Sequence, residues 1–133
     1  MKKWAFVGSF LCLMLSIISC KKENTTDEVD MIPIIYEAEI NTPGLDLQTN
    51  EYYKTTTSEG VELKSWIVNG KGVFDTTVLI KKGFAAAIQG YHVSATDWKI
   101  RIKKQNGSII AESEPEPSIS GSSYSGTATA VVE

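Results

Sequence analysis

Apolar and polar residues alternate along most of the chain after residue 33, and this period of two predicts β-strands. In residues 34–40, the apolar side chains fall on one face, while Glu37 and Glu39 fall on the other. Residues 98–104 repeat the pattern, with Trp98, Ile100 and Ile102 pointing away from the basic residues between them. Both segments have the length and the alternation of half-buried strands.

Turn residues divide the rest of the chain into further strand-like segments. Residues 41–50, which include Pro43 and Gly44, are expected to be a connection. In residues 61–68, the aliphatic side chains alternate with Glu62 and Lys64, which predicts that Val61, Leu63 and Ile67 face the core. The expected additional strands are residues 51–57, 61–68, 73–80, 84–93, 108–114 and 124–132.

Two local signals bear on how these strands connect. Residues 84–93 contain three alanines and could be helical on propensity, but their length, their flanking turns and Gly90 favour a strand with a bulge. The pair Asn106-Gly107 predicts a hairpin with a type I′ turn between 98–104 and 108–114. Glu112 and Glu114 are then expected on an exposed face opposite the basic strand.

Seven or eight short strands with regularly spaced turns predict an all-β fold, an antiparallel two-sheet sandwich over residues 34–133. The architecture is immunoglobulin-like only in outline, because this part of the chain lacks the Cys…Trp…Cys signature of antibody domains. A segment of this size is sufficient for one domain with a modest core.

The first twenty residues have the pattern of an export signal. Lys2 and Lys3 precede an apolar run over residues 4–18, which is short for a membrane span. The residues Ile17-Ile18-Ser19-Cys20 resemble the lipobox of bacterial lipoproteins. This resemblance implies a signal peptide of residues 1–19, cleavage before Cys20, and acyl chains such as palmitate on Cys20. The alternative is an uncleaved N-terminal anchor helix.

Residues 20–33 follow as a charged tether. No Asp follows Cys20, so the resemblance to enteric lipoproteins implies no retention at the inner membrane. The charged residues directly after it are similar to surface-export signals, which favours the outer membrane and possible exposure at the cell surface. Asp27, Glu28 and Asp30 lack the glycine turn and the bidentate glutamate of a calcium loop, so we expect no metal there.

Charge and residue types exclude several chemistries. The formal net charge of −3, which becomes more negative when Lys2 and Lys3 are removed, argues against nucleic-acid binding. His92 is the single histidine, which leaves no zinc ligand set and a poor basis for a Ser-His-Asp triad; we interpret it as a strand-end residue. Glu112 and Glu114 fit a solvated sheet face better than a glycosidase pair. We predict no catalytic residues and no cofactor.

Three aromatic residues are candidates for binding. Tyr52 and Tyr53 are adjacent, so one of them must face away from the core. Trp66 lies on the same side of its segment as Glu62 and Lys64. Exposed aromatic side chains stack on sugars or anchor protein partners. The alternative is that Trp66 lies at a strand crossing and is covered by a loop, and core packing is the favoured interpretation for both Trp66 and Trp98.

Several segments between Tyr36 and Val132 carry a resemblance to a known family. They are Tyr36-Glu37-Ala38, Trp98-Lys99-Ile100-Arg101-Ile102, Asn106-Gly107, Ile109-Ile110-Ala111-Glu112-Ser113 and the Ser/Gly-rich closing strand. The run of elements resembles the small β-sandwich lipoproteins that share the fold of the MmpS extracytoplasmic domain. MmpS domains carry a transmembrane helix and a cysteine pair that this chain lacks, so the resemblance implies the fold and does not imply partnership with an exporter.

The sequence therefore favours a cell-envelope lipoprotein with a non-enzymatic binding or interaction domain. Its expected partners are the membrane, through the lipid on Cys20, and a protein or glycan of unknown identity. An accessory subunit of an export or assembly complex is the alternative, and a hydrolase is less favoured. The oligomeric state stays open.

Overall fold

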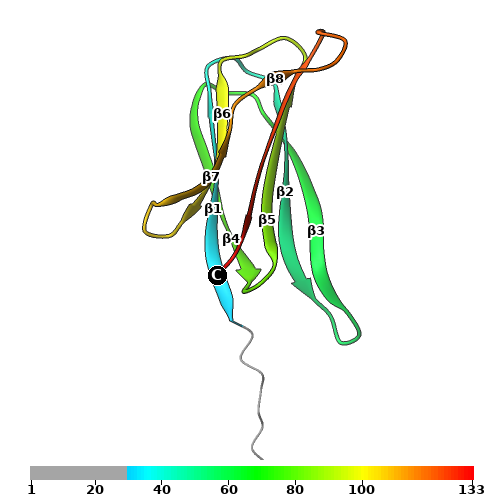
Figure 1. The fold of residues 1–133 in the computed structure, drawn as a ribbon, viewed down its shortest axis with the longest axis vertical. Helices are drawn as coiled ribbons and strands as arrows, with labels where there is room; N and C mark the ends of the chain where they lie inside the picture. The colour runs from blue at the N-terminus through cyan, green and yellow to red at the C-terminus, as the bar shows by residue number, and fades with distance from the viewer. Residues whose placement is uncertain (1–29) are drawn as a thin grey trace, which may run out of the picture.

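The structure is a computed structural model that describes residues 30–133; the predicted signal peptide, Cys20 and residues 21–29 of the tether lie outside the described residues. The described chain is built from strands that cross repeatedly between two layers (Figure 1). They are β1 (Met31–Ile40), β2 (Leu45–Lys54), β3 (Glu59–Val68), β4 (Gly72–Lys81), β5 (Ala85–His92), β6 (Trp98–Lys104), β7 (Ile109–Ser113), β8 (Glu116–Pro117) and β9 (Tyr124–Val131).

Two antiparallel sheets form the layers. The four-stranded sheet has the order β4-β1-β6-β7, and the five-stranded sheet has the order β3-β2-β5-β9-β8. The predicted all-β, two-sheet sandwich is confirmed, with nine strands in residues 30–133 instead of seven or eight. The additional strand is the short β8, which carries the chain from β7 of one sheet to β9 of the other.

The core lies between the sheets, and the ring of Trp98 crosses it. Trp98 is buried, and its indole N–H donates to the carbonyl of Ala95. The ring covers the backbones of Gly90 and Gly126, where an added Cβ would come within 2.8 Å and 3.1 Å of ring carbons. Gly90 therefore makes room for the indole, and Gly126 makes room for the indole and for Glu114 O and Ser113 Oγ, each 2.8 Å from such a Cβ. The other buried apolar residues include Ile34, Tyr36, Ala38, Ile40, Leu45, Leu47, Ile80, Ala86, Ile88, Ile100, Ile102 and Ala128.

A buried polar cluster joins the two sheets through Tyr36 and Asn50. The Tyr36 hydroxyl reaches from β1 to Asn50 on β2 and accepts from the backbone N–H of Ala87 on β5 at 3.2 Å. The Asn50 amide donates to Ala85 O and accepts from Ala87 N, each at 2.6 Å. Because β2 and β5 pair through the backbone only up to Thr49, the Asn50 side chain continues their hydrogen bonding. Burial raises the pKa of Tyr36 to about 12, so its hydroxyl stays protonated.

Two predicted boundaries are wrong. β1 begins at Met31, three residues before the expected start at Ile34, and so takes up the end of the predicted tether. Residues 41–50 are not simply a connection, because β2 begins at Leu45. The buried Leu45, Leu47 and Thr49 alternate there with exposed polar residues, a strand signal that directly follows the Pro43-Gly44 turn.

The strand interpretation of residues 84–93 is confirmed, but the expected bulge is absent from it. All eight residues of β5 pair with β9 without a register shift. The predicted type I′ turn at Asn106-Gly107 is also wrong. Hydrogen bonds from Lys104 N to Ser108 O and from Gly107 N to Lys104 O define a three-residue loop, with Gly107 at a φ of 87°. Such loops combine a type I turn with a left-handed glycine, and the register of β6 and β7 shifts nearby.

The two faces of β3 are the reverse of the prediction. Leu63 and Ile67 are 71% and 61% exposed, whereas Trp66 packs against the core opposite Leu47. Among the described strands, β3 is an edge strand that pairs only with β2. At such an edge, the inner face is covered by less of the opposite sheet and tolerates polar side chains. The predicted alternation of two faces along β3 is correct, but the prediction of which face meets the core is wrong.

Candidate binding surface

The outer face of the four-stranded sheet carries alternating rows of opposite charge, and we call it the charged face. β6 is paired on one side with β1 and on the other with β7. The register sets Arg101 opposite Glu37 on β1 and opposite Glu112 on β7. Basic side chains thus lie between two acidic rows, an arrangement that stabilises the register of the sheet. The charged face consists of Glu37, Glu39, Lys99, Arg101, Lys103, Glu112 and Glu114.

Arg101 is the centre of the charged face. Its Nε donates to Glu112, and its two terminal nitrogens donate to Glu37 and Glu39, at 2.7–2.9 Å. Hydrogen bonds to Glu112 and Glu37 raise the pKa of Arg101 further above its usual range. Glu37 is only 7% exposed; burial raises the pKa of this carboxyl, but hydrogen bonds from Lys103 and Arg101 outweigh burial and lower it. Both Arg101 and Glu37 therefore stay ionised at neutral pH.

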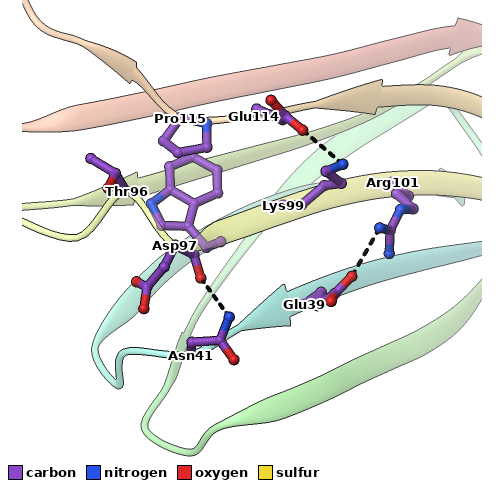
Figure 2. Close-up of a pocket in the computed structure, with 9 residues that line it drawn as sticks. Glu39, Asn41, Thr96, Asp97, Lys99, Arg101, Glu114 and Pro115 are labelled. Carbon is purple, nitrogen blue, oxygen red and sulfur yellow. Dashed lines mark hydrogen bonds and ion pairs between the residues drawn. The ribbon is translucent and has the colours of Figure 1, made fainter.

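A shallow hollow of about 400 Å³, which Trp98 helps to line, lies at one end of the charged face. Figure 2 shows Glu39, Lys99, Arg101 and Glu114 around it. Its charged walls are already paired: Lys99 with Glu114 at 2.7 Å, and Arg101 with Glu39 at 2.9 Å. The sequence placed Glu112 and Glu114 on an exposed face opposite the basic strand, and both are found there. Since a ligand would have to displace these ion pairs, the hollow is a poor candidate for a charged ligand.

His92 holds two loops together. It ends β5, as expected for a strand-end histidine, and its ring is buried. Nδ1 accepts from the backbone N–H groups of Ser94 and Ala95 at 3.0 Å and 2.8 Å, so Nε2 carries the proton and donates to Pro43 O at 3.1 Å. Both nitrogens of His92 are thus engaged with the backbone. Residues 30–133 contain no group of three or more His, Cys, Asp or Glu that could hold a metal ion.

The three candidate aromatic residues all lie on the β2–β3 pair, and each is partly buried. Tyr52 packs edge-on against Phe84 with ring centroids 5.6 Å apart, and its hydroxyl donates to Glu59 at 2.7 Å. This hydrogen bond, more than burial, raises the pKa of Tyr52 to about 12. Tyr53 lies over Gly60, and Trp66 lies against the core. The three do not form one exposed aromatic platform, and their role in binding stays a prediction.

The outer face of the five-stranded sheet is chemically different, and we call it the neutral face. Most of its side chains are amides, hydroxyls and apolar groups, and the charged residues at the outward positions of β2, β5, β8 and β9 are Asp46, Lys54 and Glu116. The register aligns Ser65, Gln48, Gln89 and Thr127 in a row across four strands. Sequence reasoning missed this surface because it appears only when the strand order is known. The neutral face consists of Gln48, Ser65, Ala87, Gln89, Tyr91, Ser125, Thr127 and Thr129.

Comparisons with known proteins add no identification: no family model, no curated protein and no solved structure matches this chain. The resemblance to MmpS domains therefore stays a prediction. Among the described residues, 30–133, there is no helix with the length and apolar character needed to cross a membrane.

Proposed function

We propose that this protein is a lipid-anchored cell-envelope protein whose β-sandwich is a non-enzymatic binding domain, and that the neutral face is its binding surface. The observation that carries the proposal is the contrast between the two outer faces. The basic side chains of the charged face are held by carboxylates of neighbouring strands. The neutral face holds exposed Gln48 and Gln89, which make no side-chain hydrogen bond to another residue of the described chain.

The chemistry of the neutral face suits an uncharged ligand rich in hydroxyl groups, such as a neutral glycan. Amide side chains such as those of Gln48 and Gln89 can both donate and accept hydrogen bonds, as sugar hydroxyls do. Tyr91, which is 41% exposed, lies one row away and offers a ring on which a sugar can stack. The two charges in the row of Tyr91 are both acidic, Asp46 on β2 and Glu116 on β8, so an anionic ligand would be repelled there.

Attachment to the membrane is proposed through lipid on Cys20, which lies outside the described residues. A stable anchor requires two or more acyl chains, at about 0.8 kcal/mol per buried CH₂. In a Cys20→Ala variant, the precursor should stay uncleaved and should lose palmitate labelling. Normal labelling of that variant would refute the anchor, and it would leave the proposal for the neutral face untouched.

The binding surface is tested by titrating purified lipidated protein with neutral and acidic oligosaccharides. Binding of a neutral glycan is expected, with a loss of about tenfold or more in Tyr91→Ala, since stacking on an exposed ring contributes about 1–2 kcal/mol. Thr77→Ala on β4 of the opposite sheet is the matched control and should bind like the parent. No binding to any neutral glycan, or equal effects of Tyr91→Ala and Thr77→Ala, would overturn the proposal.

A further inference from the structure

β3 is an open edge that carries exposed aliphatic side chains. It is ten residues long and contains no proline, and among residues 30–133 it pairs only with β2, so no other described strand uses the backbone groups on its other side. Leu63 and Ile67 point outward, and Val61 is also exposed. In Figure 1, β3 forms one margin of the molecule, and the β2–β3 hairpin extends past the neighbouring strands. Proteins usually protect such edges, because they pair readily with another strand.

The charges on β3 restrict which strand can pair with it. Glu62 and Lys64 flank Leu63 on the opposite face of the strand, form an ion pair at 3.0 Å, and are about half exposed. Charges at an edge repel most partners. A second β3, however, carries the same alternation in reverse when it runs antiparallel. With the twofold axis at Leu63, Glu62 of each copy lies opposite Lys64 of the other.

Neighbouring registers fit less well. The twofold axis, which is perpendicular to the sheet, must place one residue of β3 opposite the same residue of the second copy. If the axis fell between two residues, each side chain would lie opposite one that points to the other face of the sheet, because adjacent side chains of a strand point to opposite faces. An axis at Glu62 or at Lys64 opposes like charges. An axis at Ser65 leaves Glu59, Gly60 and Val61 without partners in β3, whereas the axis at Leu63 pairs Glu59–Ile67 along almost the whole strand.

We propose that β3 is the interface of a homodimer, in which it pairs antiparallel with β3 of a second copy about an axis at Leu63. The two five-stranded sheets then become one continuous sheet, and the two leucines cover each other. The pairing adds backbone hydrogen bonds to the apolar contact and gives each Glu62 and each Lys64, already paired within its own copy, a second opposite charge from the other copy, in the manner of strand addition at a sheet edge. This proposal goes beyond the binding function and does not depend on it.

Cross-linking at single cysteines measures the register. Leu63→Cys, Ser65→Cys and Ile67→Cys variants of the full lipidated chain are treated with a short bismaleimide, in detergent with micelles in large excess over protein. With the axis at Leu63, the paired Cβ atoms are about 5 Å apart at position 63. They are roughly 13 Å apart at position 65 and 27 Å apart at position 67, at about 3.3 Å per residue. The parent chain, with its native cysteines, gives the background.

The proposal expects a strong dimer band for Leu63→Cys and weak bands for the other two variants. The strongest band at Ser65→Cys would overturn the register, and bands equal to background throughout would overturn the dimer. In whole envelopes, cross-linking of Leu63→Cys to a different protein would overturn the choice of a second copy as partner.

Charge reversal tests the same interface in a second way. In the Leu63→Cys background, Lys64→Glu and Glu62→Lys each place like charges opposite one another at two symmetric positions. Each should reduce the dimer yield at limiting concentration by about tenfold. The double variant Glu62→Lys/Lys64→Glu restores opposite charges and should recover the yield, provided that unfolding midpoints show all three to be folded. A double variant no better than the singles would overturn the pairing of Glu62 with Lys64.

Discussion

Replacing Asn50 by aspartate tests whether the buried cluster between the sheets depends on a single donated hydrogen bond. The wild-type amide is 6% exposed and places its NH₂ group 2.6 Å from Ala85 O. Aspartate has almost the same shape and keeps an oxygen for the N–H of Ala87 and for the Tyr36 hydroxyl. Its second oxygen, however, is an acceptor that faces another acceptor. The substitution therefore changes one hydrogen bond and a charge with almost no change in volume.

The expected cost follows from the two forms of the new carboxyl group. As a carboxylate, it leaves Ala85 O without its donor, at roughly 1–3 kcal/mol, and buries a negative charge in addition. As a neutral acid, its O–H can donate to Ala85 O. Protonating an aspartate of unfolded pKa about 3.9 at pH 7 costs about 4 kcal/mol, which sets an upper limit. We expect Asn50→Asp to lose about 2–4 kcal/mol of unfolding free energy at pH 7.

The sign of the pH dependence is the sharper part of the prediction. Burial beside Ala85 O should raise the folded-state pKa of the new carboxyl above its unfolded value. The variant therefore has its full stability below about pH 3.9, where the new carboxyl is protonated in both the folded and the unfolded state. This stability is lost as the pH rises through the folded-state pKa. The gap between variant and wild type should be largest at neutral pH and should fall below about 1 kcal/mol near pH 3.5.

Urea unfolding followed by tryptophan fluorescence from about pH 3.5 to 7.5 measures this gap, with the wild type at each pH cancelling the other titrating groups. Asn69→Asp is the control, because Asn69 is exposed between β3 and β4. A gap that is independent of pH would refute the argument. So would an effect no larger than that of Asn69→Asp, because Asn50 would then not be buried against Ala85 O.

Three further substitutions test other packed sites by urea unfolding against the parent chain. Gly90→Ala should cost about 1–3 kcal/mol because its Cβ meets the Trp98 ring at 2.8 Å, and a cost below about 0.5 kcal/mol would contradict that packing. His92→Leu should cost roughly 1–3 kcal/mol because two backbone N–H groups lose their acceptor, and an unchanged stability would refute this role. Glu37→Gln should reduce stability above the ordinary carboxyl pKa of 4.5, and the deficit should shrink as the pH falls through the lowered pKa of Glu37; a constant deficit would argue against ion pairing with Arg101.

The sequence predicts well those strands that have one buried and one solvated face. In β1, the alternation identifies Tyr36 as inward and Glu37 as outward, because the strand lies in the interior of its sheet and one of its faces meets the core. The same reasoning fails for β3, where Leu63 is exposed and Trp66 is the residue that packs inward. Alternation defines two faces, but only the neighbouring strands decide which of them meets the core.

The candidate surfaces were less predictable than the fold, since they depend on contacts between distant residues. The pairing of Arg101 with Glu112 follows from the hairpin, and the sequence anticipates it. The hydrogen bond from Arg101 to Glu37 requires β1 to lie beside β6, although the two residues are 64 positions apart in the sequence. Asn50 gave no signal at all, because a buried amide is recognised only by the backbone groups that it satisfies.

The proposals for the anchor, the neutral face and β3 together predict how the protein lies on a membrane. A twofold axis perpendicular to the sheet sends the two β1 starts in opposite directions along the strands. Residues 20–30 span at most about 35 Å when extended, and a ten-residue strand is about 33 Å long. If the strands were perpendicular to the membrane, one copy would have to stretch its tether almost fully. If the strands lie parallel to the membrane, both anchors can reach one leaflet.

In that orientation, one outer face of the dimer meets the membrane and the other meets the solvent. A binding surface must stay accessible, so the charged face should lie toward the membrane and the neutral face away from it. This orientation is measured with a fluorophore attached to Thr77→Cys on β4 or to Gln89→Cys on β5, which are outward positions of the two sheets. The protein is placed in vesicles whose lipid headgroups carry a quencher, and the quenching of each fluorophore is compared. Thr77 should be quenched several-fold more than Gln89. Equal quenching would mean that the domain has no fixed orientation, and the reverse order would place the neutral face against the lipid, which is incompatible with its proposed role in binding.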